Sequence, residues 1–219
     1  MALTDKLTAI GDAIRSKTGG SELLTLDEMP QEIQSIQTGG GGSSEEYDDI
    51  VLMFTPDSNE ARIEVYETQS TGQIRDYAFY YCFNLKQISI PNITMIRSNC
   101  FYDCTALEQV VLPNVTQMLA NSFRGCSSLH RAELDKSLIS FGSYCFRDSA
   151  LDTLILKSET VCPLNSTNVF QDCPIEEGTG YIYVPQALIE QYKVATNWVT
   201  FASQFRAIED YPEICGGDA

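Results

Sequence analysis

The chain has 219 residues, 43% of them hydrophobic, which is enough material for a substantial core and one or two domains. Its formal net charge of -16 disfavours nucleic acid and anionic lipid surfaces as partners. No apolar run resembles a signal peptide or is long enough to span a bilayer, so we expect neither secretion through a cleaved signal nor membrane insertion.

Residues 1–37 are expected to form a small helical hairpin. Apolar residues recur at helical spacing over residues 4–17, two glycines end that pattern, and a shorter stripe follows over residues 29–36. So small a pair of helices has too little core to be stable alone. We therefore expect this segment to need a partner or to self-associate.

The same segment carries two characteristic phrases. They read Leu-x-x-Ile-x-x-Ala-Ile-Arg-x-Lys-Thr-Gly from Leu7 and Leu-Thr-Leu-Asp-Glu-Met-Pro-x-x-Ile-x-x-Ile from Leu24. They are similar to a leader on tail-associated proteins of phages and prophages of Gram-positive bacteria. The resemblance implies a virion context, and a generic helical hairpin is the alternative interpretation.

Residues 38–48 are glycine-rich and polar, so they read as a flexible linker at a domain boundary. Residues 49–72 are expected to form an N-terminal β-hairpin cap. Its strands would cover residues 49–54 and 61–66, and the hairpin would shield the open edge of the first repeat of the next domain.

Residues 73–185 repeat with a period of 22 to 24 residues. The repeat is marked by Phe79, Phe101, Phe123, Phe146 and Phe170. Its template is Ile-x-x-x-x-Phe-x-x-Cys-x-x-Leu-x-x-Ile-x-Ile-Pro, whose alternating tail predicts a β-strand and whose Phe-x-x-Cys-x-x-Leu part has helical-turn spacing. A single repeat cannot bury its apolar face alone. We therefore expect a mainly β solenoid of about five stacked repeats with short helical turns.

This template resembles the unit of the BspA-like leucine-rich repeat family, and residues 74–91 are the nearest copy. The resemblance covers about residues 70–210. It implies a repeat fold and a binding role without specifying a ligand. Residues 186–219 are expected to form a C-terminal helical cap and tail, with a helix over 185–198 and a last strand over 206–209. That ending also looks like the family's terminal element.

Most of the eight cysteines fall at two repeat positions. One position holds Cys82, Cys104, Cys126, Ser149 and Cys173, and the other holds Ala78, Cys100, Ser122, Cys145 and Val169. Because Ser and Ala also occur at these positions, we interpret the thiols as small buried side chains. Neighbouring strands about 4.8 Å apart leave a disulfide open as an alternative. One Cys per repeat does not favour a tetrahedral zinc site, so we expect no metal and no cofactor.

His130 is the single histidine, at a repeat position shared with Lys86, Glu108 and Asp152. A nucleophilic cysteine needs an oriented base, and nothing at this variable position indicates one. The sequence also lacks a glycine-rich phosphate loop, a Gly-x-Ser-x-Gly elbow and a His-Glu-x-x-His motif. We therefore do not expect an enzyme.

The outward positions of the repeat strands are the candidate binding surface, because stacked repeats present such positions as one extended face. These positions are Lys86, Gln87, Ser89, Glu108, Gln109, Val111, His130, Arg131, Glu133, Asp152, Thr153 and Ile155. The turns add Tyr80, Tyr81 and Tyr102, and tyrosine is a frequent contact residue. A solvated face with ordinary scatter is the alternative.

Two functions remain open. The first is a phage or prophage tail-associated adhesion or receptor-binding protein that contacts a bacterial surface protein or glycan. In it, residues 1–37 mediate tail attachment or homo-oligomerisation, and the protein resides in the virion tail, or in the bacterial cytoplasm before release. The second is a cellular BspA-like adhesion or scaffold protein with no virion role.

Overall fold

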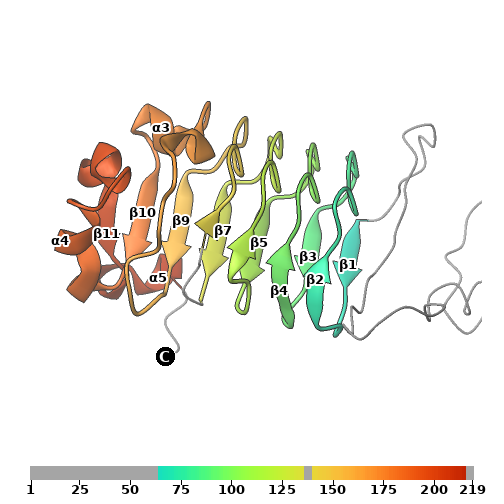
Figure 1. Cartoon of the computed structure of the whole chain (residues 1–219), viewed down its shortest axis with the longest axis horizontal. Coiled ribbons are helices and arrows are strands. Elements are labelled where there is room, and N and C mark those ends of the chain that lie inside the picture. The colour runs from blue at the N-terminus through green and yellow to red at the C-terminus, as the bar shows by residue number, and fades with distance from the viewer. Residues whose placement is uncertain (1–63, 136–139, 216–219) are drawn as a thin grey trace, which may run out of the picture. The chain divides into compact units, whose positions relative to one another are not determined.

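The computed structural model describes residues 64–135 and 140–215 (Figure 1). All of them lie in the second of two units into which the chain divides, Tyr47–Ala219. The predicted helical hairpin over 1–37, the linker over 38–48 and the first hairpin strand over 49–54 lie outside the described residues.

Short parallel strands follow one another along the stack of repeats. β1 (Val65–Glu67) pairs with β3 (Gln87–Ser89), and a five-stranded sheet follows with β5 (Gln109–Leu112), β7 (Arg131–Leu134), β9 (Thr153–Leu156), β10 (Tyr181–Val184) and β11 (Phe205–Ala207) in that order. In register, Val110 pairs with Ala132 and Ala132 pairs with Leu154. This confirms the alternating tail of the template as a strand whose apolar side faces the core.

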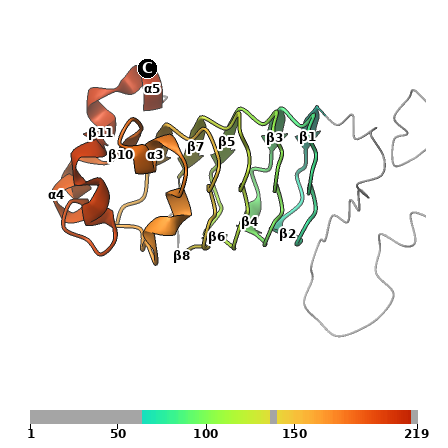
Figure 2. The same ribbon diagram turned by 90° about the horizontal axis from the view of Figure 1, so that it is seen from above.

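A second row of short parallel strands was not predicted. It consists of β2 (Gly72–Ile74), β4 (Ile93–Ile96), β6 (Gln117–Met118) and β8 (Ser140–Phe141). Figure 2 shows the two rows on opposite sides of the stack. The approach between repeats on this second side is close, since a Cβ on Gly142 would lie 2.2 Å from the carbonyl carbon of Leu119.

The turn segments of the first four repeats are single turns and do not continue as helices. Their backbone has positive φ two residues before the phenylalanine and again two residues after it, as at Tyr77 and Tyr81. Between these positions the Phe79 amide donates to the Cys100 carbonyl of the next repeat at 2.7 Å. These hydrogen bonds tie one repeat to the next. Within the segment, the Cys82 amide donates to the Phe79 carbonyl and the Leu85 amide to the Cys82 carbonyl, both at 3.1 Å, so the predicted turn spacing is present without a continuous helix. In the last repeat, Thr167–Phe170 form a short 3-10 helix.

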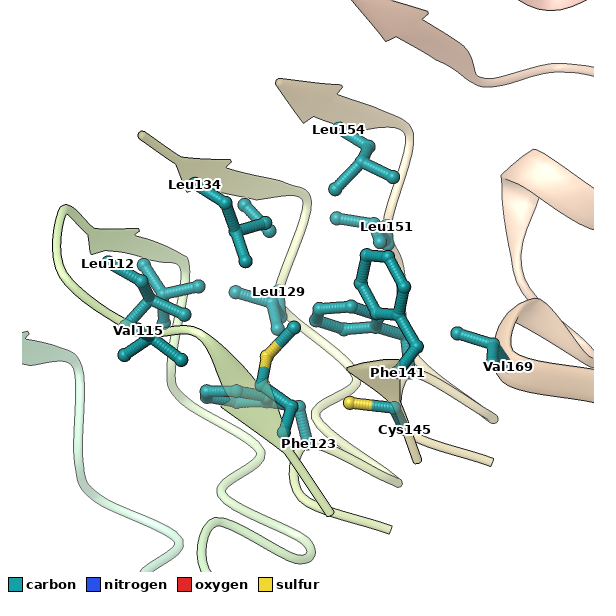
Figure 3. Close-up of a cluster of buried hydrophobic side chains, with 14 of the residues drawn as sticks. Leu112, Val115, Phe123, Leu129, Leu134, Phe141, Cys145, Leu151, Leu154 and Val169 are labelled. Atoms are coloured by element: carbon teal, nitrogen blue, oxygen red, sulfur yellow. The ribbon is translucent and has the colours of Figure 1, made fainter. Parts of the chain in front are cut away.

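The core is built around a column of phenylalanine rings. Successive centroids of Phe79, Phe101, Phe123, Phe146 and Phe170 are 4.9, 5.0, 5.6 and 6.2 Å apart, with the rings nearly parallel. Figure 3 shows Leu112, Leu134 and Leu154 projecting into this core from three successive strands. The predicted repeat spacing thus stacks like side chains directly upon each other.

The C-terminal end closes the last repeat with short elements instead of the long helix predicted over 185–198. These elements are η2 (Thr167–Phe170) and α3 (Pro174–Glu177) before β10, then η3 (Gln186–Leu188), α4 (Ile189–Tyr192), η4 (Trp198–Gln204), η5 (Ile208–Asp210) and α5 (Pro212–Cys215). The helical part of the predicted segment ends at Tyr192, and Asn197 then takes a φ of 63°, just before the fully buried Trp198. The Trp198 ring packs 5.9 Å from Phe170, centroid to centroid, and so caps the aromatic column.

Candidate interaction surface

The outer strand face is the side of β3, β5, β7 and β9 turned away from the core. Two rows cross it in register: Gln109, Arg131 and Thr153 form one, and Val111, Glu133 and Ile155 form the other. The two rows have different surroundings at their two ends.

Over β3 and β5 the face is exposed to solvent. The exposed side chains there are Lys86, Gln87, Ser89, Glu108, Gln109 and Val111, and we name these six residues the open face. The Lys86 ammonium lies 2.9 Å from a carboxylate oxygen of Glu64, and Val111 is 44% exposed. His130 and Asp152, beside the open face, are also exposed, and an oxygen of Asp152 accepts a 2.7 Å hydrogen bond from the Thr153 hydroxyl.

At the other end, two predicted binding residues are buried. Ile155 is fully buried and Glu133 is 7% exposed, which contradicts their expected exposure. Ile155 and Tyr183 form a small apolar cluster with Ile208, Tyr211 and Ile214 of the chain's end. The outward side chains are apolar there, so burying them beneath the C-terminal segment is favourable.

Charged groups hold the border of this covered region. Arg131 donates a hydrogen bond to the Ile214 carbonyl and contacts the Glu133 carboxylate, which also contacts Lys157. Burial works against the charge of Lys157, but Glu133 and Asp135 outweigh it and raise the Lys157 pKa. The buried Glu133 carboxylate is paired with two cations inside the fold. Arg131 and Glu133 therefore stabilise the position of the C-terminal segment.

The turns of the first two repeats carry an aromatic group. The tyrosine turn cluster comprises Tyr77, Tyr80, Tyr81, Phe83 and Tyr102, whose rings contact one another. A hydrogen bond with Tyr81 raises the pKa of Tyr80 to about 12. Tyr77 and Phe83, which are 56% and 53% exposed, were not among the predicted contact residues. The available signal was Tyr77 itself, an aromatic residue where the next two repeats have asparagine.

The seven described cysteines are buried and unpaired, in agreement with their interpretation as small buried side chains. The Cys104 thiol donates to the Phe79 carbonyl at 3.1 Å, and the Cys126 thiol donates to the Phe101 carbonyl at 3.0 Å. Burial raises the pKa of Cys82 to about 11 and that of Cys145 to about 12. Thiols with such pKa values are poor nucleophiles at neutral pH.

Two further observations concern metal binding and catalysis. Over residues 64–135 and 140–215, no group of three or more His, Cys, Asp or Glu side chains is placed to hold a metal ion. An open pocket of about 320 Å³ lies between residues 161–165 and 195–198, and no Asp, Glu, His, Lys or Arg lines it. That pocket therefore lacks the histidine, carboxylate and lysine side chains that most often serve in acid–base catalysis.

A comparison with known protein families matches residues 63–182, more than half of the chain, to six copies of the BspA type leucine rich repeat region. The chain belongs to this family. The BspA-type match begins just ahead of β1, so β1, which we expected in a hairpin cap, lies within the matched repeats and pairs in parallel with β3. It counts six copies where we expected about five, and it ends before the C-terminal elements.

BspA-type repeats imply an interaction or adhesion role. Among curated proteins, no relative matches the chain. None of the helices in the part of the chain that the structure describes is long and apolar enough to cross a membrane.

Proposed function

We propose that this protein binds a bacterial surface protein or glycan through its open face, as an adhesion or receptor-binding protein of a phage or prophage tail. The observation that carries the proposal is the contrast between the two ends of the outer strand face. The chain covers Ile155 with its own C-terminal segment, whereas Val111 stays 44% exposed over β5.

The composition of the open face supports recognition. Val111 is an exposed apolar side chain among polar ones, with Gln109 and Ser89 exposed nearby. Protein interfaces commonly combine an apolar centre with a polar rim that supplies hydrogen bonds. Amide side chains such as Gln87 and Gln109 both donate and accept, which suits a peptide backbone or sugar hydroxyls equally.

The tail-associated part of the proposal is supported by the resemblance of residues 1–37 to tail leaders. In this proposal the leader attaches the chain to a tail or to sister chains, and the repeats supply binding. A cellular adhesion or scaffold protein would keep the binding role of the repeats and lack the attachment role.

The test compares the full chain with a chain that begins at Tyr47, in binding to intact Gram-positive cells and in mass by light scattering. We expect both chains to bind cells, and only the full chain to be oligomeric or to attach to tails. Absence of cell binding by both would contradict the adhesion role. Equal masses together with equal tail attachment would contradict the role of the leader.

A further inference from the structure

The aromatic rings of the tyrosine turn cluster pack closely against one another. The Tyr80 ring centroid lies 5.3 Å from Tyr77, 4.2 Å from Tyr81 and 5.1 Å from Tyr102. At these distances the rings fill the space between one another, so a ligand meets their outer faces and edges instead of entering a cage. The faces most available belong to Tyr77 and Phe83, which are 56% and 53% exposed.

The equivalent position in a later repeat shows which side chain packs over such a ring. Tyr144 stands two residues before its repeat phenylalanine, as Tyr77 does, and both have positive φ, 59° and 63°. In that later repeat the Arg147 guanidinium lies 5.4 Å over the Tyr144 ring. In the first repeat Tyr80 stands in place of that arginine, and Tyr77 is 56% exposed.

The same pairing of arginine with tyrosine occurs twice more among the described residues, once at the cluster itself. Arg124 lies 5.6 Å over the ring of Tyr102, which belongs to the cluster, and Arg206 lies 4.4 Å over the Tyr181 ring. A guanidinium over a tyrosine face is stabilised by the ring's electron distribution and also stacks flat against it. The exposed rings of the first repeat therefore present a surface of the kind on which this protein's arginines already pack.

The net charge of the whole chain, -16, favours a cationic partner over an anionic one. Near the cluster both signs occur, since the Asp103 carboxylate acts electrostatically on Tyr80 and Arg124 lies over the Tyr102 ring. Asp76, next to Tyr77 in the chain, pairs with Arg97 at 3.1 Å and stays partly exposed. Complementary charge steers association and suppresses like-charged partners. A neutral glycan would not be attracted by the negative net charge of the chain.

We propose that the tyrosine turn cluster docks a cationic segment of a partner protein, with an arginine or lysine side chain lying over Tyr77 as Arg147 lies over Tyr144. This inference rests on the proposed recognition role and narrows the partner of the turn surface to a protein with exposed basic residues. The connection from Phe83 leads directly into Lys86 and β3, so a segment bound at the cluster lies next to the open face.

The test titrates the full chain with the peptide acetyl-Gly-Arg-Gly-Arg-Gly-Arg-amide, following binding by calorimetry. The test variant is Tyr77→Asn, and the matched control is Tyr144→Asn, the same change at the same repeat position. Asparagine suits the backbone because Asn99 and Asn121 occupy this position with positive φ in other repeats. Neither substitution alters the net charge.

We expect Tyr77→Asn to weaken peptide binding about threefold to tenfold and Tyr144→Asn to leave it nearly unchanged. Equal affinity of all three proteins would overturn the proposal, since it would mean attraction by net charge alone. Binding of a neutral oligosaccharide such as maltohexaose that is lost in Tyr77→Asn, without loss of peptide binding, would also overturn it. Because the titration contains no cells, its failure leaves the cell-binding test of the open face standing.

Discussion

Replacing Phe123 with alanine is expected to lower the free energy of unfolding by about 3–5 kcal/mol. Phe123 lies in the middle of the aromatic column, 5.0 Å from Phe101 and 5.6 Å from Phe146 between ring centroids, and it is fully buried. Removing the ring leaves a cavity that faces both neighbouring repeats. The cost is large because the repeats on each side are tied by backbone hydrogen bonds and cannot close the gap.

The measurement is urea denaturation monitored by circular dichroism, with Phe83→Ala as the control. Phe83 belongs to a repeat turn but is 53% exposed, so its loss is expected to cost less than about 1 kcal/mol. A cost for Phe123→Ala as small as that for Phe83→Ala would show that the aromatic column does not carry the stability of the stack.

The second large effect concerns alkaline pH. Burial raises the pKa of Cys145 from its ordinary 9.0 to about 12. In the unfolded chain this thiol ionises near its ordinary pKa, so the unfolded state releases its proton first as the pH rises. The contribution of Cys145 to stability is therefore intact below about pH 9 and is lost as the pH rises toward 12. Its size is on the order of 3–4 kcal/mol.

A Cys145→Ser variant isolates this effect from other alkaline titrations. Serine is a fair replacement, because Ser122 occupies the same repeat position and is also fully buried. Unfolding in urea under reducing conditions is measured from about pH 8 to about pH 11.5. We expect the stability of the original chain to fall more steeply than that of the variant. Parallel curves would mean that the Cys145 thiol does not have the raised pKa.

The repeat period explains why much of the fold could be predicted. Phe79, Phe101 and Phe123 recur at equal spacing, which places them in one column, and the alternating tail places Val110 and Leu112 toward the core. The second row of strands, β2, β4, β6 and β8, could not be predicted in the same way. Strands as short as Gln117–Met118 contain too few residues to show a period of two, and they exist because neighbouring repeats hold them in place.

The candidate surface was predictable only in part. Period two correctly placed Gln109 and Val111 outward, and both are exposed. It placed Ile155 outward as well, but a local pattern does not reveal that residues 208–214 return to cover that position. Apolar character at this repeat position gives no signal either, because Val111 is apolar and 44% exposed where Ile155 is buried.

The most direct test of recognition through the open face compares Val111→Lys with Val194→Lys in binding to intact Gram-positive cells. Both valines are exposed, at 44% and 78%, and the two variants carry the same change in charge. A lysine at the centre of an interface buries an unpaired charge, so we predict that Val111→Lys weakens cell binding by about tenfold or more. Val194→Lys, on the C-terminal cap, should bind as the original chain does. Equal binding by both variants would contradict the assignment of the open face as the binding surface.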